Sequence, residues 1–475
     1  MSKSKVLKAG MGYIIGNYLL KGISFITIPL FSRLMSTSEY GLFNTFIAYE
    51  SIVYIFIGFA LHSSFKNARY KFIESDNETT RYDRYVSSAI LFVLINIFIW
   101  SLVLIFFYND ISGIFKLDKF SILLILLYSG GMAILACYNS YISLEYKYES
   151  FLRISFFNAI SNVAISLLLM VTFLHNNRYL ARIIGSTIPV VILSIYICYI
   201  FFKRQAPFFK NIDLVWGLKY SLPIIPHGIS QVILTQFDRI MIMHMIGSTT
   251  SGIYSFAYNI YSIIAVTSSS LDNVWNPWVY EKLHNKEYNL IRHYSTIYAV
   301  FMLIFSISVI LLSPELISIL GGEKYREAVY SVIPIIASGF FSFLYTLPAS
   351  IEYYNEKTNY IAIGTAIAAV INIILNFFCI QEFGYISAAF TTLLTYILYF
   401  IVHYLISIKL HGSCLFNTKI ILVMCLILFA TSFLTYCTIS NIIARISLLM
   451  GCVFFSVVIF FKNDDVRKII KHYKK

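Results

Sequence analysis

Long apolar stretches recur along the whole of this 475-residue chain, and they limit its fold more than any other feature. A helix that crosses a bilayer needs about 20 mostly apolar residues. Charged residues make up only 12% of the chain, whereas about 25% is usual for a soluble domain. Fourteen stretches meet the requirement, at 10–31, 41–61, 87–108, 120–139, 152–174, 179–202, 222–246, 252–274, 294–313, 328–350, 358–380, 384–407, 418–438 and 441–461. The sequence therefore predicts an all-α integral membrane protein with about 14 transmembrane helices.

The distribution of lysine and arginine tests this number of spans, because cytoplasmic loops of membrane proteins are rich in both. With the N-terminus in the cytoplasm, 26 of the 36 basic residues fall on the cytoplasmic side and 8 on the other, with Lys21 and Arg239 inside spans. A missed span would invert every later loop and remove this bias. We therefore expect both termini in the cytoplasm, with membrane lipids as direct partners.

The two halves of the chain are related by a weak internal repeat. Residues 7–43 align without gaps on residues 218–254, and Gly41 falls on Gly252. The two copies are six spans apart, so both enter the membrane in the same direction, which is typical of a parallel repeat in transporters. We predict two six-helix lobes, 1–205 and 206–410, followed by 411–475 with spans 13 and 14 and a basic cytoplasmic tail.

Several other classes of protein are disfavoured. The net charge of +13 is explained by basic loops beside anionic lipid, and the sequence has no Gly-rich phosphate loop and no signature of nucleic-acid binding. None of the seven cysteines forms a C-x-x-C pair, so we expect no metal site. The loops are short, whereas a polymerase or ligase acting on periplasmic sugars usually carries a large outer loop with catalytic residues. We therefore predict that the chain is not an enzyme.

Residues in spans 1, 2, 7 and 8 carry a resemblance to a known family. The first copy reads Pro29-Leu30-Phe31-Ser32-Arg33-Leu34, followed by Ser38-Glu39-Tyr40-Gly41, and the second contains Phe237-Asp238-Arg239 and Gly252-Ile253-Tyr254. This pattern resembles bacterial polysaccharide flippases of the Wzx type. Their superfamily also contains the MATE drug exporters and the lipid II flippases. Members are often described with twelve spans, so spans 13 and 14 are an addition.

The resemblance implies a function and a cellular location. It implies translocation of undecaprenyl-pyrophosphate-linked oligosaccharide repeat units across the bacterial inner membrane, through a cavity between two rocking lobes, for O-antigen or another surface polysaccharide. A polysaccharide polymerase and a chain-length regulator are then candidate partners. No cofactor is expected, and coupling to H⁺ or Na⁺ stays open. The alternatives are a MATE-like cation-coupled drug antiporter, disfavoured because span 1 has no acid between Met1 and Arg33, and a membrane polymerase or ligase.

Polar residues of span 1 and span 2 are the first candidates for a substrate site. A charge at the bilayer centre costs at least about 2.5–3.5 kcal/mol and therefore usually faces the interior of a bundle. Lys21 and Glu50 lie at similar distances from the turn between the two spans, hence at one depth. In one interpretation the two residues form a structural ion pair. In the other, Lys21 faces the cavity and attracts the pyrophosphate, and Glu50 modulates the charge of Lys21. Asn17 lies on the same helical face as Lys21.

Span 7 supplies a second polar stripe, with Gln231 and Asp238 on one helical face. Two such stripes, one from each lobe, suit the walls of a hydrated cavity, although polar packing between helices would give the same pattern. Arg239 is a candidate contact for the pyrophosphate, because its planar fork matches phosphate oxygens. The other interpretation is that Asp238 and Arg239 brace neighbouring helices.

Four further residues are candidates for gating or coupling. Pro223 and Pro226 remove backbone donors, so we expect span 7 to kink near its cytoplasmic end. His227 follows them and is a candidate for proton coupling or, in the simpler interpretation, a packing residue. Arg33 lies at the periplasmic exit of span 1, as part of a gate or as an interfacial anchor.

Overall fold

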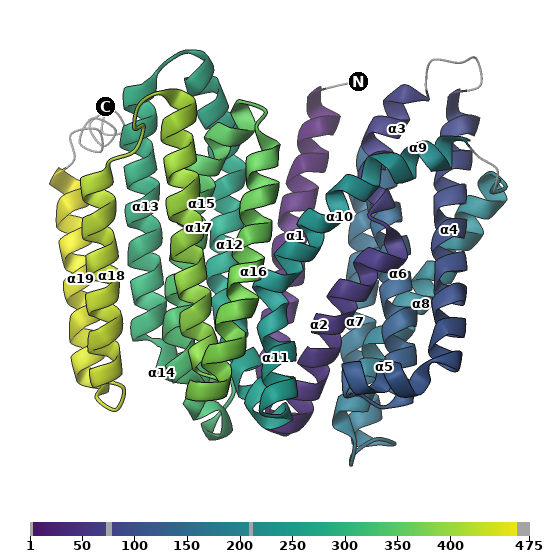
Figure 1. The fold of residues 1–475 in the computed structure, drawn as a ribbon, viewed down its shortest axis with the longest axis horizontal. Helices are drawn as coiled ribbons and strands as arrows, with labels where there is room; N and C mark the ends of the chain where they lie inside the picture. Colours follow the sequence, from purple (N-terminus) through teal and green to yellow (C-terminus); the bar gives the residue numbers. More distant parts are fainter. Residues whose placement is uncertain (1–2, 73–77, 209–211, 463–475) are drawn as a thin grey trace. The chain divides into compact units, whose positions relative to one another are not determined.

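The structure, a computed structural model, describes residues 3–72, 78–208 and 212–462, and all regular elements among these residues are helices, with no β-strand. The basic tail predicted to lie in the cytoplasm falls almost entirely outside these residues. Figure 1 shows the α-helices, which are α1 (Lys3–Leu34), α2 (Thr37–Gly58), α3 (Phe65–Lys71), α4 (Glu78–Phe106), α5 (Tyr108–Phe115), α6 (Lys119–Leu144), α7 (Tyr148–Val171), α8 (Arg178–Arg204), α9 (Ile212–Ser221), α10 (Ile225–Val232), α11 (Asp238–Met245), α12 (Ser248–His284), α13 (Tyr288–Leu311), α14 (Ser313–Leu320), α15 (Val329–Tyr354), α16 (Thr358–Phe383), α17 (Ser387–His411), α18 (Thr418–Cys437) and α19 (Ile442–Lys462).

Eleven helical segments of the described chain are long and apolar enough to cross a membrane, which confirms the all-α membrane class. They correspond to predicted spans 1–6 and 9–13. Predicted span 7 is interrupted within 222–246, and predicted span 8 lies in the 37-residue α12, which is more polar than the other spanning helices. Predicted span 14 corresponds to α19. Its segment Ile442–Cys452 is apolar but shorter than the 18 residues required of a spanning helix. The fourteen predicted segments are therefore helical, and eleven of them satisfy a strict criterion of length and hydropathy.

The chain divides into two compact units, residues 1–252 and residues 253–475. Helices α1 to α11 and the first turn of α12 belong to the first unit, and the rest of α12 with α13 to α19 belongs to the second. The lobes predicted from the repeat, 1–205 and 206–410, stay a prediction.

Short polar segments fix the helix ends of the first unit. Ser36 and Glu39 form a reciprocal capping box at the start of α2, which satisfies backbone donors that have no partner within the helix. The second oxygen of Glu39 accepts a hydrogen bond from the backbone N–H of Arg178 at 2.7 Å. The Arg178 guanidinium in turn donates to the carbonyl of Leu34. Glu39 thereby ties the α1–α2 turn to the start of α8.

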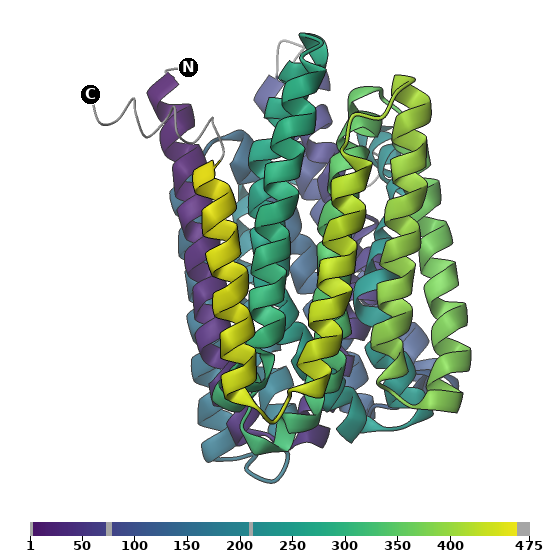
Figure 2. The same ribbon diagram turned by 90° about the vertical axis from the view of Figure 1, so that its left-hand side faces the viewer.

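Helix α15 is the most buried span of the second unit and packs against α13, α16, α17 and α18. Helices α18 and α19 form a hairpin whose short connecting turn is visible in Figure 2. Arg445 on α19 attaches this hairpin to α14 through two hydrogen bonds to the Glu315 carboxylate, at 2.6 and 2.7 Å. It also donates to the carbonyl of Leu311 at the end of α13. Spans 13 and 14 are therefore fastened to the second unit by a paired, nearly buried charge.

Candidate functional site

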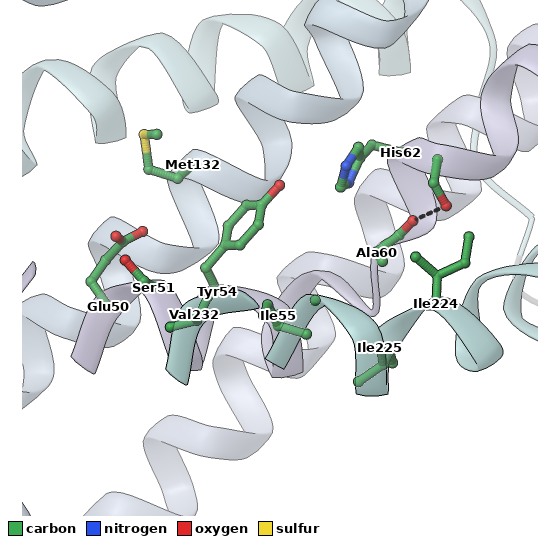
Figure 3. A pocket seen from close by; sticks show the side chains of 12 residues that line it. Glu50, Ser51, Tyr54, Ile55, Ala60, His62, Met132, Ile224, Ile225 and Val232 are labelled. Atoms are coloured by element: carbon green, nitrogen blue, oxygen red, sulfur yellow. Dashed lines mark hydrogen bonds between the residues drawn. The ribbon is translucent and has the colours of Figure 1, made fainter. Parts of the chain in front are cut away.

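A cavity of about 420 Å³ lies inside the first unit, between α2, the segment after it, α6 and the interrupted helix that contains α10. Figure 3 shows Glu50 and His62 toward opposite ends of this cavity, with Tyr54 between them. Most of the remaining lining is apolar, and the full set is Glu50, Ser51, Tyr54, Ile55, Ala60, His62, Ser63, Met132, Ile224, Ile225, Gly228 and Val232. A few polar groups that converge in an apolar cavity are typical of a binding site.

A sharp bend at the end of α2 forms one wall of the cavity. Phe59 and Ala60 have φ angles of 47° and 50°, in the left-handed region that residues other than glycine rarely adopt. They end α2 and start a 3₁₀ turn at Leu61–Ser64. This bend brings the His62 ring to 6.2 Å from the Tyr54 ring, measured between centroids. Burial lowers the pKa of the His62 imidazole below its usual value, so the ring is neutral at pH 7.

Glu50 is the acidic group of this cavity. Its residue is only 8% exposed, yet it lies near the middle of a helix long and apolar enough to span the membrane. Among the described residues, no side chain forms an ion pair with its carboxyl group or donates a hydrogen bond to it. An acidic side chain without a partner at this depth is a candidate functional group, because its charge is costly in a span.

The opposite wall is the interrupted helix at 222–245. Pro223 lies in a 3₁₀ turn, Leu222–Ile224, and Pro226 lies in the first turn of α10. The regular α-helix is therefore interrupted at these prolines, while the predicted kink and a role in gating stay predictions. A π-helical turn at Ile233–Phe237, which the sequence did not predict, separates α10 from α11. A π-turn inserts an extra residue into the helical ladder and is frequent at functional sites.

The predicted residues of span 1 lie apart from this cavity. Helix α1 packs on α7, where Gly12 and Gly16 lie against Tyr148 and Leu152. Asn17 and Lys21 are exposed in the first unit. No ion pair joins Lys21 to Glu50 in the described structure, so the structural-pair interpretation does not hold for this conformation.

The predicted residues of span 7 are divided between partly and fully buried positions. Gln231 is partly buried on α10. Asp238 and Arg239 open α11 and are buried, with exposed fractions of 1% and 7%. Arg239 donates a hydrogen bond to the side chain of Gln236, one turn earlier. In this conformation the Arg239 guanidinium is therefore buried and inaccessible to a ligand from solvent. Its contact with the pyrophosphate stays a prediction.

Two further gating candidates have different surroundings. Arg33 is exposed at the end of α1. His227 is half-buried on α10, and its Nδ1 has no hydrogen-bond partner among the described residues. Their roles in gating and coupling remain predictions.

The repeated Gly41 and Gly252 meet at a close crossing of α2 and the first turn of α12. A Cβ atom added to Gly41 would lie 1.9 Å from the carbonyl oxygen of Ser248, and one added to Gly252 would lie 1.9 Å from the carbonyl oxygen of Thr37. Position 248 is 211 residues after position 37, the same offset as between the glycines, so the contact is symmetric between the two copies of the repeat. The hydroxyls of Ser38 and Ser248 are hydrogen-bonded at 2.7 Å. We call this contact the glycine crossing.

Comparison with known proteins places the chain in a protein family. The family described as polysaccharide biosynthesis protein matches residues 6–283, more than half of the chain. The chain belongs to the polysaccharide biosynthesis protein family. The match covers residues 6–252 of the first unit, which include the cavity and the glycine crossing.

Related sequences and solved structures agree with this membership. The chain is 21% identical over 376 residues to Lsg locus putative protein 1 of Haemophilus influenzae, covering 77% of this chain and 89% of that protein. It is 23% identical over 401 residues to a probable low-salt glycan biosynthesis flippase of Haloferax volcanii, covering 83% and 82%. The fold is similar to the lipid II flippase MurJ in an inward closed conformation, with a TM-score of 0.71, 17% identity, and coverage of 95% and 99%. It is also similar to an inward-facing MATE multidrug resistance transporter, with a TM-score of 0.65, 10% identity, and coverage of 83% and 95%. This member of the polysaccharide biosynthesis protein family therefore has a fold similar to that of MurJ and of the MATE transporter, as the resemblance implied.

Sequence reasoning missed two residues that line the cavity, and it did not select Arg182, which lies outside the cavity. Tyr54 and His62 were not selected, because neither breaks the apolar pattern in a way that distinguishes a cavity from a helix end. Arg182 is one of the 8 basic residues counted on the non-cytoplasmic side, and in the structure it lies in α8 with its guanidinium 3.8 Å from the ring centroid of Phe31 and hydrogen-bonded to Ser166. A basic residue four positions into an apolar stretch was the available signal for Arg182.

Proposed function

We propose that this chain is a flippase that moves undecaprenyl-pyrophosphate-linked oligosaccharide repeat units across the bacterial inner membrane by alternating access. Membership in the polysaccharide biosynthesis family and the flippase among its relatives support a lipid-linked glycan as substrate. The product then serves assembly of O-antigen or another surface polysaccharide. A polymerase and a chain-length regulator act on the delivered units.

The observation that carries this proposal is the exposed polar face of α1. Asn17, Lys21 and Ser24 are all exposed in the first unit, inside a helix that is long enough to span the membrane. An ammonium group in contact with hydrocarbon is costly, so this face borders a hydrated space within the bilayer. Such a space suits the sugar, and Lys21 supplies a positive charge for the pyrophosphate.

Transport by cells tests the function directly. In a strain that lacks the gene, lipid-linked oligosaccharide is expected to accumulate in the cytoplasmic leaflet, and units reaching the periplasm should fall to background. Normal delivery of units to the periplasm would refute the flippase. The alternative is a MATE-like cation-coupled antiporter, whose fold is similar to that of this chain. Greater drug susceptibility of the same strain, together with normal glycan delivery, would favour this alternative.

Replacing Lys21 with glutamine is expected to lower the rate of oligosaccharide transport by about tenfold, because a hydrogen bond to a charged group contributes about 1.5–3 kcal/mol. The rate is measured in the deletion strain complemented with each variant at equal membrane content. Lys119→Gln serves as the control, since Lys119 is exposed at the start of α6. Equal rates for both variants would remove Lys21 from the substrate site.

Glu50 is our candidate for the proton-coupling group, because it is an acidic residue in a cavity without a described partner. Glu50→Gln keeps the shape of the side chain but cannot release a proton. Its transport rate is expected to lose its dependence on pH, measured in proteoliposomes between about pH 5.5 and 8 with and without a Na⁺ gradient. Glu356→Gln, at an exposed position after α15, is expected to keep the wild-type profile. An unchanged profile for Glu50→Gln would contradict coupling through this residue.

A further inference from the structure

Helix α9 has one face fixed to the first unit. The Arg81 guanidinium donates two hydrogen bonds to the Asp213 carboxylate, at 2.7 and 3.0 Å. The Trp216 ring packs edge-on against Phe72, with ring centroids 5.6 Å apart, and the Lys71 ammonium lies 4.5 Å from the Trp216 centroid. These contacts set the rotation of α9 about its own axis.

The opposite face of α9 is apolar and exposed. Ile212 and Val215 are 84% and 53% exposed, and Leu222, in the 3₁₀ turn that follows, is 48% exposed. With Lys219, which is also exposed, they are spaced by three, four and three residues and share one helical face. In Figure 1, α9 runs crosswise to the bundle helices α4 and α6 of the same unit, unlike a spanning helix. A short amphipathic helix in this orientation is typical of a segment that lies in the membrane interface.

Helix α3 extends this surface with positive charge. The Asn67 side chain donates a hydrogen bond to the Tyr220 hydroxyl at 2.8 Å, which joins α3 to α9. Helix α3 carries three basic residues and no acid, and the single acid of α9, Asp213, is held by Arg81. Lys66 on α3 and Lys219 on α9 are both exposed, and neither forms an ion pair in the described structure.

We propose that the exposed surface of α3 and α9 binds anionic lipid headgroups of the cytoplasmic leaflet. The apolar side chains of α9 enter the boundary between headgroups and acyl chains, and Lys66 and Lys219 contact lipid phosphates. With the N-terminus in the cytoplasm, as the basic residues predict, α3 and α9 face the cytoplasmic leaflet whichever substrate is moved. Helix α9 (Ile212–Ser221) overlaps the start of the second copy of the repeat, so lipid composition thereby acts on the segment that leads into this copy.

The full-length protein in nanodiscs tests this proposal. An environment-sensitive fluorescent amino acid placed at position 215 reports whether this face lies in lipid or in water. Its emission is expected to shift to shorter wavelength as phosphatidylglycerol replaces phosphatidylcholine, and high salt should weaken the shift. The double variant Lys66→Gln/Lys219→Gln should need about tenfold more anionic lipid for half of the shift, since each lysine near an anionic surface adds about 1 kcal/mol.

A matched control separates a local site from general surface charge. Lys286→Gln/Lys357→Gln removes two exposed lysines from loops predicted to lie on the same side of the membrane, and it is expected to leave the lipid dependence unchanged. An emission that does not respond to phosphatidylglycerol would overturn the proposal, and so would an equal effect of both double variants. Loss of this response with normal glycan transport would refute the lipid site alone and leave the flippase intact.

Discussion

A disulfide across the glycine crossing is expected to stop transport almost completely and to release it again on reduction. The hydroxyls of Ser38 and Ser248 are 2.7 Å apart, so cysteines at these positions, Ser38→Cys and Ser248→Cys, are close enough for a bond between their sulfurs. The crossing lies where the chain passes from the first unit to the second, since α12 begins at Ser248 and the second unit at Ile253. We expect this contact to separate in one state of an alternating-access cycle.

The measurement is transport in vesicles before and after mild oxidation, followed by addition of a reductant. Each single variant, which keeps all seven native cysteines, is the matched control and should respond to neither treatment. Full transport by the oxidised double variant, with the cross-link verified by mass spectrometry, would show that the crossing stays closed throughout the cycle.

Replacing Glu352 with alanine is expected to lower the free energy of unfolding by about 3–5 kcal/mol, the range for breaking a buried ionisable pair. In the second unit, Oε1 of Glu352 on α15 lies 2.6 Å from Nδ1 of His403 on α17, and both side chains are completely buried. The rings of Tyr345 and Tyr399 enclose the imidazole, with centroids 4.9 and 4.6 Å away. Without the carboxyl group, a polar nitrogen of His403 is left without a partner in an apolar interior.

Unfolding by sodium dodecyl sulfate in mixed micelles measures this effect. Glu356→Ala is the control, because Glu356 is exposed one turn later, and it should change the stability by less than about 0.5 kcal/mol. The double variant Glu352→Leu/His403→Phe removes both polar partners and is expected to recover part of the loss. A change below about 1 kcal/mol for Glu352→Ala would mean that the pair does not hold α15 to α17.

The spans were predictable because the bilayer permits few alternatives. A helix must satisfy its own backbone groups in lipid, so length and apolarity are sufficient to locate regular spans such as α8 or α16. The break at Pro223 was also predictable, since proline lacks a donor. The π-turn at Ile233–Phe237 was not, because it depends on packing around the segment and leaves no trace in the periodicity.

The site was less predictable, for two geometric reasons. Equal depth along two helices does not fix their rotation, so Lys21 is exposed whereas Glu50 lines a cavity. The bend that forms the cavity uses left-handed backbone at Phe59 and Ala60, residue types that seldom adopt it. A glycine at either position would have been a signal for the bend, and neither position carries one.

The glycine crossing has the geometry of an interface between two identical subunits. In an interface with twofold symmetry, residue i of one subunit contacts residue j of its partner, and residue j contacts residue i. Thr37 against Gly252 and Ser248 against Gly41 obey this rule once the offset of 211 residues is removed. Two half-length chains with the same sequence could make this contact as a parallel homodimer. The crossing therefore acts within one chain as a homodimer contact would between two, except that a change at one glycine is not repeated at the other and has to be accommodated by an unchanged partner.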